Sequence, residues 1–106
     1  MMTAWTILVM ASLCEVVMAL GLKGSHGFTR LGGSLVAVLG GVASMGLLAL
    51  ALRHFPMGTG YALWTGLGAV FTAVVGMIAL GESRDPVRLG AIALIVVGVT
   101  VLGWRE

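Results

Sequence analysis

Residues 3–22 read TAWTILVMASLCEVVMALGL, an apolar run that is long enough to cross a membrane as a helix and that carries a single acid, Glu15. At about 1.5 Å of rise per residue, Glu15 lies roughly 18 Å along this helix, near the middle of a hydrocarbon core about 30 Å thick. A charged side chain at that depth is costly, and such residues usually face a cavity or a bundle interior and handle ions or protons. Glu15 is therefore the first candidate for a functional residue.

A structural interpretation of Glu15 competes with this functional one. Its carboxyl group could be permanently protonated, or bonded to a neighbouring helix. Ser12 and Met18 share the face of Glu15, because residues three and four apart lie on one side of a helix. A ligand that meets Glu15 would therefore also meet these two side chains.

Composition assigns the whole chain to the membrane class. Of its 106 residues, 59% are hydrophobic and 9% are charged, and the mean hydropathy is +1.13. The pattern predicts one all-α integral membrane domain with four transmembrane helices, over residues 3–22, 31–52, 57–80 and 86–104. The first run is too long for a signal-peptide core and follows no basic segment, so we expect it to be retained.

The distribution of charge excludes other classes of function. Despite a net charge of +2, the six Lys and Arg residues are spread over separate loops and form no basic stripe, which argues against nucleic-acid binding. We expect no cofactor, no metal site and no enzymatic activity. The lipid bilayer is the expected environment of the chain.

The second and third apolar runs contribute further candidates. Ser44 is the mid-depth hydroxyl of the second run, and a bond back to its own helix and a role in a site are both open interpretations. Tyr61, Trp64 and Gly68 share one face of the third helix, and Tyr and Trp carry polar groups that need partners in a dry environment. Gly66 and Gly68 are predicted to form a flexible point, where helices can kink.

The last run is predicted to serve assembly. Asp85 is placed as its N-cap and Pro86 as its first helical residue. No charge occurs between Arg88 and Arg105, so this helix offers no proton or ion chemistry. It does offer a face suited to packing against a second helix of the same kind. That face is formed by Ala91, Leu94, Ile95 and Gly98.

Four short spans leave too little protein to enclose a pathway, which implies a dimer. Taken together, the motifs resemble those of a small multidrug resistance transporter, and the resemblance covers essentially the whole chain. They are Glu15-Val16-Val17, the loop Gly27-Phe28-Thr29-Arg30, and the segment from Pro56 to Gly66. Within that family, Trp64-Thr65-Gly66 and Leu80-Gly81-Glu82-Ser83 resemble the guanidinium-exporter branch.

The resemblance implies an antiparallel, dual-topology dimer in the bacterial inner membrane that exports guanidinium and related small organic cations in exchange for protons. It makes Glu15 the shared site of proton and substrate. Ser44 and Trp64 would hold its carboxylate, and Tyr61 would control communication between the protomers. Met18 stands where this branch typically has a Trp, and Gly60 replaces the usual Ala.

Physical chemistry supports such an exchange independently. Guanidinium is planar, always charged at neutral pH, and offers paired N–H donors that match carboxylate oxygens, so two facing Glu15 side chains could clamp it. A proton and a cation would then exclude each other. Three alternatives stay open: a broader exporter of quaternary ammonium or aromatic cations, favoured by the flexible Met18; one subunit of a heterodimeric pair; and an assembly subunit that transports nothing.

The loop charges predict weak topological bias. With the N-terminus inside, the inner side carries Arg53 and Arg105; inverted, it carries the four other Lys and Arg residues. Four against two is a small difference under the positive-inside rule. Reporters fused to the C-terminus should therefore register on both sides of the membrane, and reporting from one side alone would contradict an antiparallel homodimer.

Overall fold

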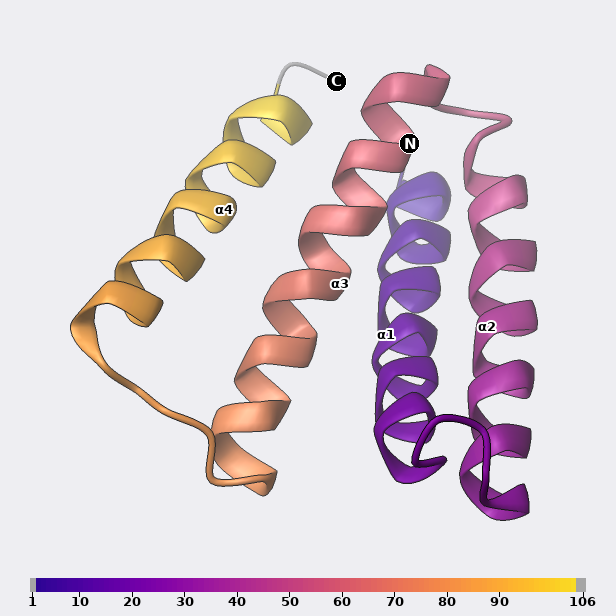
Figure 1. Ribbon diagram of the computed structural model, residues 1–106. Helices are drawn as coiled ribbons and strands as arrows, with labels where there is room; N and C mark the ends of the chain where they lie inside the picture. The colour runs from indigo at the N-terminus through magenta and orange to yellow at the C-terminus, as the bar shows by residue number, and fades with distance from the viewer. Residues whose placement is uncertain (1, 105–106) are drawn as a thin grey trace.

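The computed structural model describes residues 2–104 and has four α-helices in that range (Figure 1). They are α1 (Met2–Gly24), α2 (Leu31–Ala51), α3 (Met57–Ala79) and α4 (Pro86–Trp104). Each is long and apolar enough to cross a membrane. The prediction of four transmembrane helices is confirmed, and the largest boundary difference is at the end of α1, which continues past Leu22 to Gly24. Arg105, used above for topology, lies outside the described residues.

The helices stand in the spatial order α4, α3, α1, α2 (Figure 1). α1 packs most extensively against α2 and also against α3, whereas α4 packs against α3. The start of α1, the end of α4 and the α2–α3 connection lie at one end of the bundle, and the other two connections lie at the opposite end (Figure 1). Both ends of the described chain are therefore on the same side, as an even number of spans requires.

Glycine allows α1 and α2 to approach closely. A Cβ atom on Gly40 of α2 would lie only 2.8 Å from the backbone nitrogen of Met18. A Cβ on Gly21 of α1 would run into the backbone of Ala37 in the same way. Because backbone cannot move aside as a flexible side chain can, these glycines permit the contact that the glycine-rich sequence of α2 predicts for a membrane helix.

The hydrophobic core fills the half of the bundle where the chain begins. Trp5 packs edge-on against Phe55, with ring centroids 5.3 Å apart, and so ties α1 to the α2–α3 connection. The core is formed by Ala4, Leu8, Ala11, Leu48, Ala51, Phe55, Leu63 and Trp64. Towards the other end, the face of α3 that meets α1 carries only small residues, namely Gly68, Ala69, Thr72, Ala73 and Gly76. These side chains are too small to fill the space between the two helices, so the core gives way to a cavity.

The α3–α4 connection is fixed by a left-handed turn and by a side-chain cap on α4. Gly81 adopts a left-handed conformation, with φ of +66°, and the turn lets the Glu82 N–H donate to the carbonyl of Gly76 at 3.1 Å. Asp85 Oδ1 accepts the backbone N–H of Arg88 at 2.9 Å, which confirms the predicted N-cap. That hydrogen bond, together with one from the Ser83 hydroxyl, holds the pKa of Asp85 below its usual range.

No described residue of α4 is buried within the chain. Leu94 is 74% exposed, and nothing lies near Gly98 where a Cβ would be. Ile95, by contrast, faces α3, since its Cγ2 atom is 3.8 Å from the Cβ position of Gly66. The proposed packing face of α4 is thus largely open in the single chain, and its pairing with a second copy remains a prediction.

Candidate functional site

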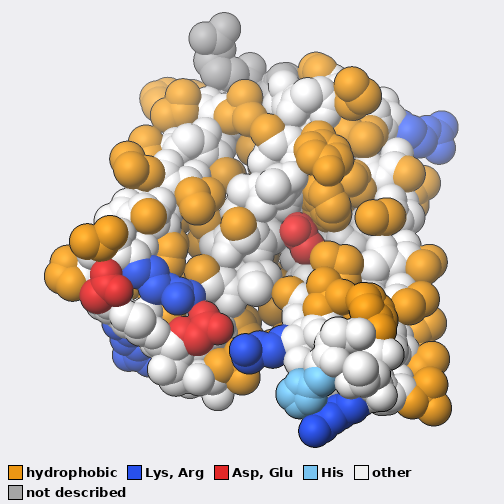
Figure 2. All heavy atoms as spheres, viewed as in Figure 1, with side chains coloured by type: hydrophobic (Ala, Val, Ile, Leu, Met, Phe, Trp, Pro, Cys, Tyr) orange, Lys and Arg blue, Asp and Glu red, His pale blue; other side chains and the backbone are white. Residues whose placement is uncertain are grey.

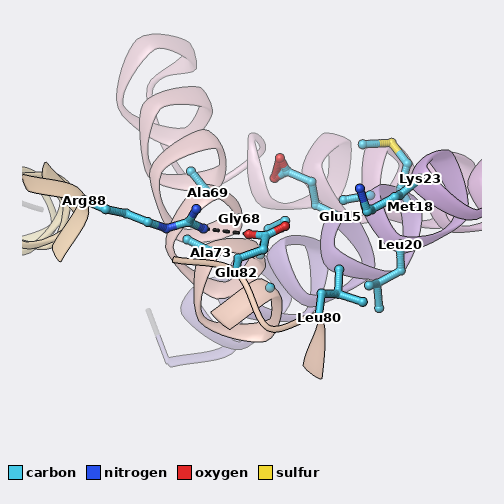
Figure 3. Close-up of a pocket in the computed structure, with 13 residues that line it drawn as sticks. Glu15, Met18, Leu20, Lys23, Gly68, Ala69, Ala73, Leu80, Glu82 and Arg88 are labelled. Atoms are coloured by element: carbon cyan, nitrogen blue, oxygen red, sulfur yellow. Dashed lines mark hydrogen bonds and ion pairs between the residues drawn. The ribbon is translucent and has the colours of Figure 1, made fainter. Parts of the chain in front are cut away.

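A cavity of about 410 Å³ opens between α1 and α3 in the half of the molecule that the core leaves unfilled. Glu15 enters it from α1, and Arg88 reaches towards Glu82 along its other side (Figure 3). Lys23, which the extension of α1 to Gly24 carries, is the fourth charged residue of the lining. Charged side chains gather around the end of the bundle that bears the α1–α2 and α3–α4 connections, whereas the rest of this face is largely hydrophobic (Figure 2).

The carboxylate of Glu15 rests directly on the backbone of α3. A Cβ atom on Gly68 would collide with the carboxylate, so glycine at this position is what admits the acid. Oε1 of Glu15 is buried and has no hydrogen-bond partner within residues 2–104. An acceptor that is buried at mid-membrane depth and left unbonded is costly unless a proton or a cation occupies it. The site therefore has the chemistry of a cation or proton receptor.

Ser44 and Trp64 are bonded to one another rather than to this carboxylate. Trp64 Nε1 donates to Ser44 Oγ at 2.9 Å, and Ser44 Oγ donates to the carbonyl of Ala11 at 2.7 Å. In an α-helix the carbonyl of Ala11 also accepts the backbone N–H four residues on, which is that of Glu15. The pair thus supports the turn of α1 that carries Glu15, and a direct bond to the carboxylate stays a prediction.

The other predicted residues of α1 lie around this level of the bundle. Ser12 is fully buried, and its hydroxyl donates to the carbonyl of Leu8 at 3.1 Å, with the carbonyl of Trp64 3.5 Å away. Ser12 does not line the cavity, whereas Met18 does. The Met18 sulfur also lies against α2, 3.2 Å from where a Cβ of Gly41 would be. The structure therefore brings Glu15 and Met18 into one cavity and places Ser12 in the adjoining core.

Tyr61 and Gly66 lie outside the cavity. Tyr61 packs edge-on against Trp64, with ring centroids 5.3 Å apart, and is 54% exposed in the single chain. Its hydroxyl is thus free to meet groups beyond this chain, as a role between protomers requires. Gly66 faces α4, where a Cβ would collide with Val99. α3 is one continuous helix from Met57 to Ala79, and the kink at Gly66 and Gly68 stays a prediction.

Sequence reasoning missed most of the cavity lining. Glu82 and Arg88 form an ion pair, with Arg88 Nη2 2.7 Å from Glu82 Oε1. A signal for the floor of the cavity was available, since small residues recur every four positions along α3 at Gly68, Thr72 and Gly76. The placement of the ion pair depends on the turn at Gly81, for which apolar periodicity gives no indication.

Comparison with known proteins identifies relatives of the chain. Residues 3–95 match the family described as Small Multidrug Resistance protein. The chain is 53% identical over 96 residues to the Guanidinium exporter of Escherichia coli (strain K12), and the aligned region covers 91% of each protein. Proteins of the same name from Citrobacter freundii and Salmonella typhimurium are 48% identical over 96 residues, again covering 91% of each.

The hydrogen bond between Trp64 and Ser44 predicts coupled losses of stability. Ser44→Ala leaves the indole N–H without its acceptor, and Trp64→Phe removes the donor. A double-mutant cycle on unfolding free energies in detergent should give a coupling of about 0.6 kcal/mol, the average between membrane helices, and no more than about 1.7 kcal/mol, the largest such value. Ser34→Ala is the matched control, because that hydroxyl bonds only to the carbonyl of Arg30 near the start of α2. Additive losses would show that the hydrogen bond contributes no coupling energy.

Proposed function

The chain belongs to the small multidrug resistance family, and we propose that it exports guanidinium, the cargo in the name of its relatives called Guanidinium exporter, and also related small organic cations. The chain is accordingly a multi-pass transporter of the bacterial inner membrane. The observation that carries the proposal is the Glu15 carboxylate, which lines a cavity between transmembrane helices and whose buried Oε1 has no hydrogen-bond partner among residues 2–104.

Guanidinium suits this carboxylate for reasons of geometry and charge. Its planar fork of N–H donors matches the two oxygens of a carboxylate and forms charge-assisted hydrogen bonds. The neighbouring wall of α3 consists of glycine, alanine and threonine, so nothing bulky on α3 prevents a flat ion from lying against Glu15. The carboxylate supplies the only negative charge among the lining residues that is not already paired, since Glu82 bonds to Arg88.

The open cavity has room for cations larger than guanidinium. At about 30 Å³ per water molecule, 410 Å³ corresponds to more than a dozen waters, whereas guanidinium has only four non-hydrogen atoms. Substituted guanidiniums, and small quaternary ammonium ions as a second candidate class, would therefore find room. Apolar contacts for such substituents are available from Met18, Leu20 and Leu80.

Energy coupling in this proposal comes from competition at one carboxylate. A proton and a cation neutralise the same charge, so each excludes the other from Glu15. If the cavity changes the side it faces only when the carboxylate is neutralised, export of a cation is coupled to import of a proton. This makes the chain a secondary active antiporter.

Two protomers are required because the single chain does not close its own pathway. The cavity is partly open, and no described residue of α4 is buried. A second copy in antiparallel orientation would cover these surfaces and bring a second Glu15 to the site; a homologous subunit is the alternative partner. Uptake by liposomes that contain this protein alone, tested with guanidinium, alkylguanidiniums and tetra-alkylammonium ions, separates these possibilities and tests the proposed activity.

Removal of the charge at Glu15 should abolish coupled transport. Glu15→Gln keeps the volume of the side chain but neither titrates nor attracts a cation, so proton-driven uptake should fall to the level of protein-free liposomes. Gly68→Ala should weaken transport through the same group, because its methyl pushes the carboxylate aside. Gly58→Ala is the control in α3, since nothing lies near its Cβ position. Uptake that persists in Glu15→Gln would place the coupling chemistry elsewhere.

Met18 should set the breadth of specificity. A Trp at this position can donate an indole N–H to the carboxylate and narrow the cavity, whereas a flexible Met can do neither. Met18→Trp should raise the preference for guanidinium over small quaternary ammonium ions by about tenfold, or about 1.4 kcal/mol. Val17→Trp, at an exposed neighbouring position, is the control. Identical rankings of the cations by wild type and Met18→Trp would reduce Met18 to a filler of space.

A further inference from the structure

We propose that Glu82 is a second cation-binding carboxylate, at the mouth of the cavity, which the guanidinium group of Arg88 occupies until a cargo guanidinium displaces it. This inference rests on the proposed function, because it assigns a further step to the same cargo. It gives Glu82 and Arg88 a role in cargo entry and release that is distinct from the binding of cargo at Glu15.

The geometry places the two carboxylates on one path. Glu15 lies on Gly68 and Glu82 lies on Gly76, since a Cβ at either glycine would collide with the carboxylate concerned. Eight residues of helix separate these positions, or about 12 Å along α3. Between them lies Thr72, and both carboxylates line the same cavity (Figure 3). A cation that enters from the connection end therefore passes Glu82 before it reaches Glu15.

The present occupant of Glu82 has the chemistry of the proposed cargo. Arg88 Nη2 donates to Glu82 Oε1 at 2.7 Å, so a guanidinium group already binds this carboxylate. Nε of Arg88 is buried and has no hydrogen-bond partner in the described part of the chain, so the pair uses only part of the donor set that a guanidinium offers. A free guanidinium could form the two parallel hydrogen bonds that are the preferred arrangement with a carboxylate.

The ion pair is also exposed enough to be exchanged. The side chains of Arg88 and Glu82 are 32% and 37% exposed, and such pairs contribute little to stability because water screens them. A competing ion of the same chemistry can therefore replace Arg88 without unfolding the connection. The turn at Gly81 and the N-cap at Asp85 hold the backbone in place independently of the side-chain pair.

Two simpler roles make different predictions for the same residues. If the ion pair only holds α4 against the connection, the loss of Glu82 and the loss of Arg88 both weaken cargo binding. If both residues act only through the charge of the mouth, loss of both leaves that net charge unchanged and restores wild-type affinity. If Arg88 competes with cargo for Glu82, removal of the Arg88 side chain tightens cargo binding only in a protein that retains Glu82.

The test is guanidinium binding and transport by purified full-length variants in nanodiscs and liposomes at fixed ionic strength. Arg88→Gln should lower the Kd and KM for guanidinium by about two- to fivefold, the scale of an exposed ion pair. Glu82→Gln should raise both by a similar factor, and the double variant should match Glu82→Gln alone. Arg88→Lys, which keeps the charge without the planar fork, should lie between wild type and Arg88→Gln.

Arg84→Gln is the matched control, because it removes the same charge from the connection four residues before Arg88, where Arg84 bonds to the carbonyl of Met77 instead. It should leave Kd and KM unchanged. Circular dichroism and elution as a dimer exclude misfolded variants. Shifts of the same sign in both single variants, a double variant that returns to wild type, or no shift at all would overturn the inference while guanidinium transport stands. Failure of wild type to bind guanidinium would instead overturn the proposed function, and this inference with it.

Discussion

The hydrogen bonds from Trp64 to Ser44 and from Ser44 to the carbonyl of Ala11 are the constraint on which the site depends. In hydrocarbon no water satisfies an indole N–H or a hydroxyl, so each must find a partner within the protein. These two bonds join α3, α2 and α1 at one level of the bundle. They end on the turn that carries Glu15, and so fix the height and direction of the acid without using its carboxylate.

The shape of the site follows from the sizes of the side chains on the face of α3 that meets α1. Between its start and Gly68, α3 presents Leu63 and Trp64 to α1, and the two helices enclose a core. From Gly68 to Gly76, the residues of α3 that line the space next to α1 are all small, and a cavity remains. The contact between two helices thus forms a hydrophobic core in one half of the bundle and encloses a cavity with charged side chains in the other.

The sequence alone predicted what depends on local composition and depth. Four helices followed from hydropathy, and Glu15 was identified by its position in an apolar run. What could not be predicted depends on contacts between helices: no periodicity shows that Trp64 and Ser44 bond to each other. The ion pair was missed because Glu82 lies in a connection and Arg88 in the first turn of α4, where charges normally mark only the ends of helices. Their meeting depends on a left-handed turn and on the path of α4, which are properties of the folded backbone.

The contact between Glu15 and Gly68 also has an evolutionary consequence. The carboxylate occupies the place that any side chain at position 68 would need, so each of the two positions limits what the other can tolerate although they lie on different helices. Because the carboxylate is the end of a flexible side chain, a methyl group at position 68 would leave the fold intact but would displace the carboxylate of Glu15 from its contact with α3. Selection for stability alone would accept that change, and only selection for the activity itself would keep this glycine in place.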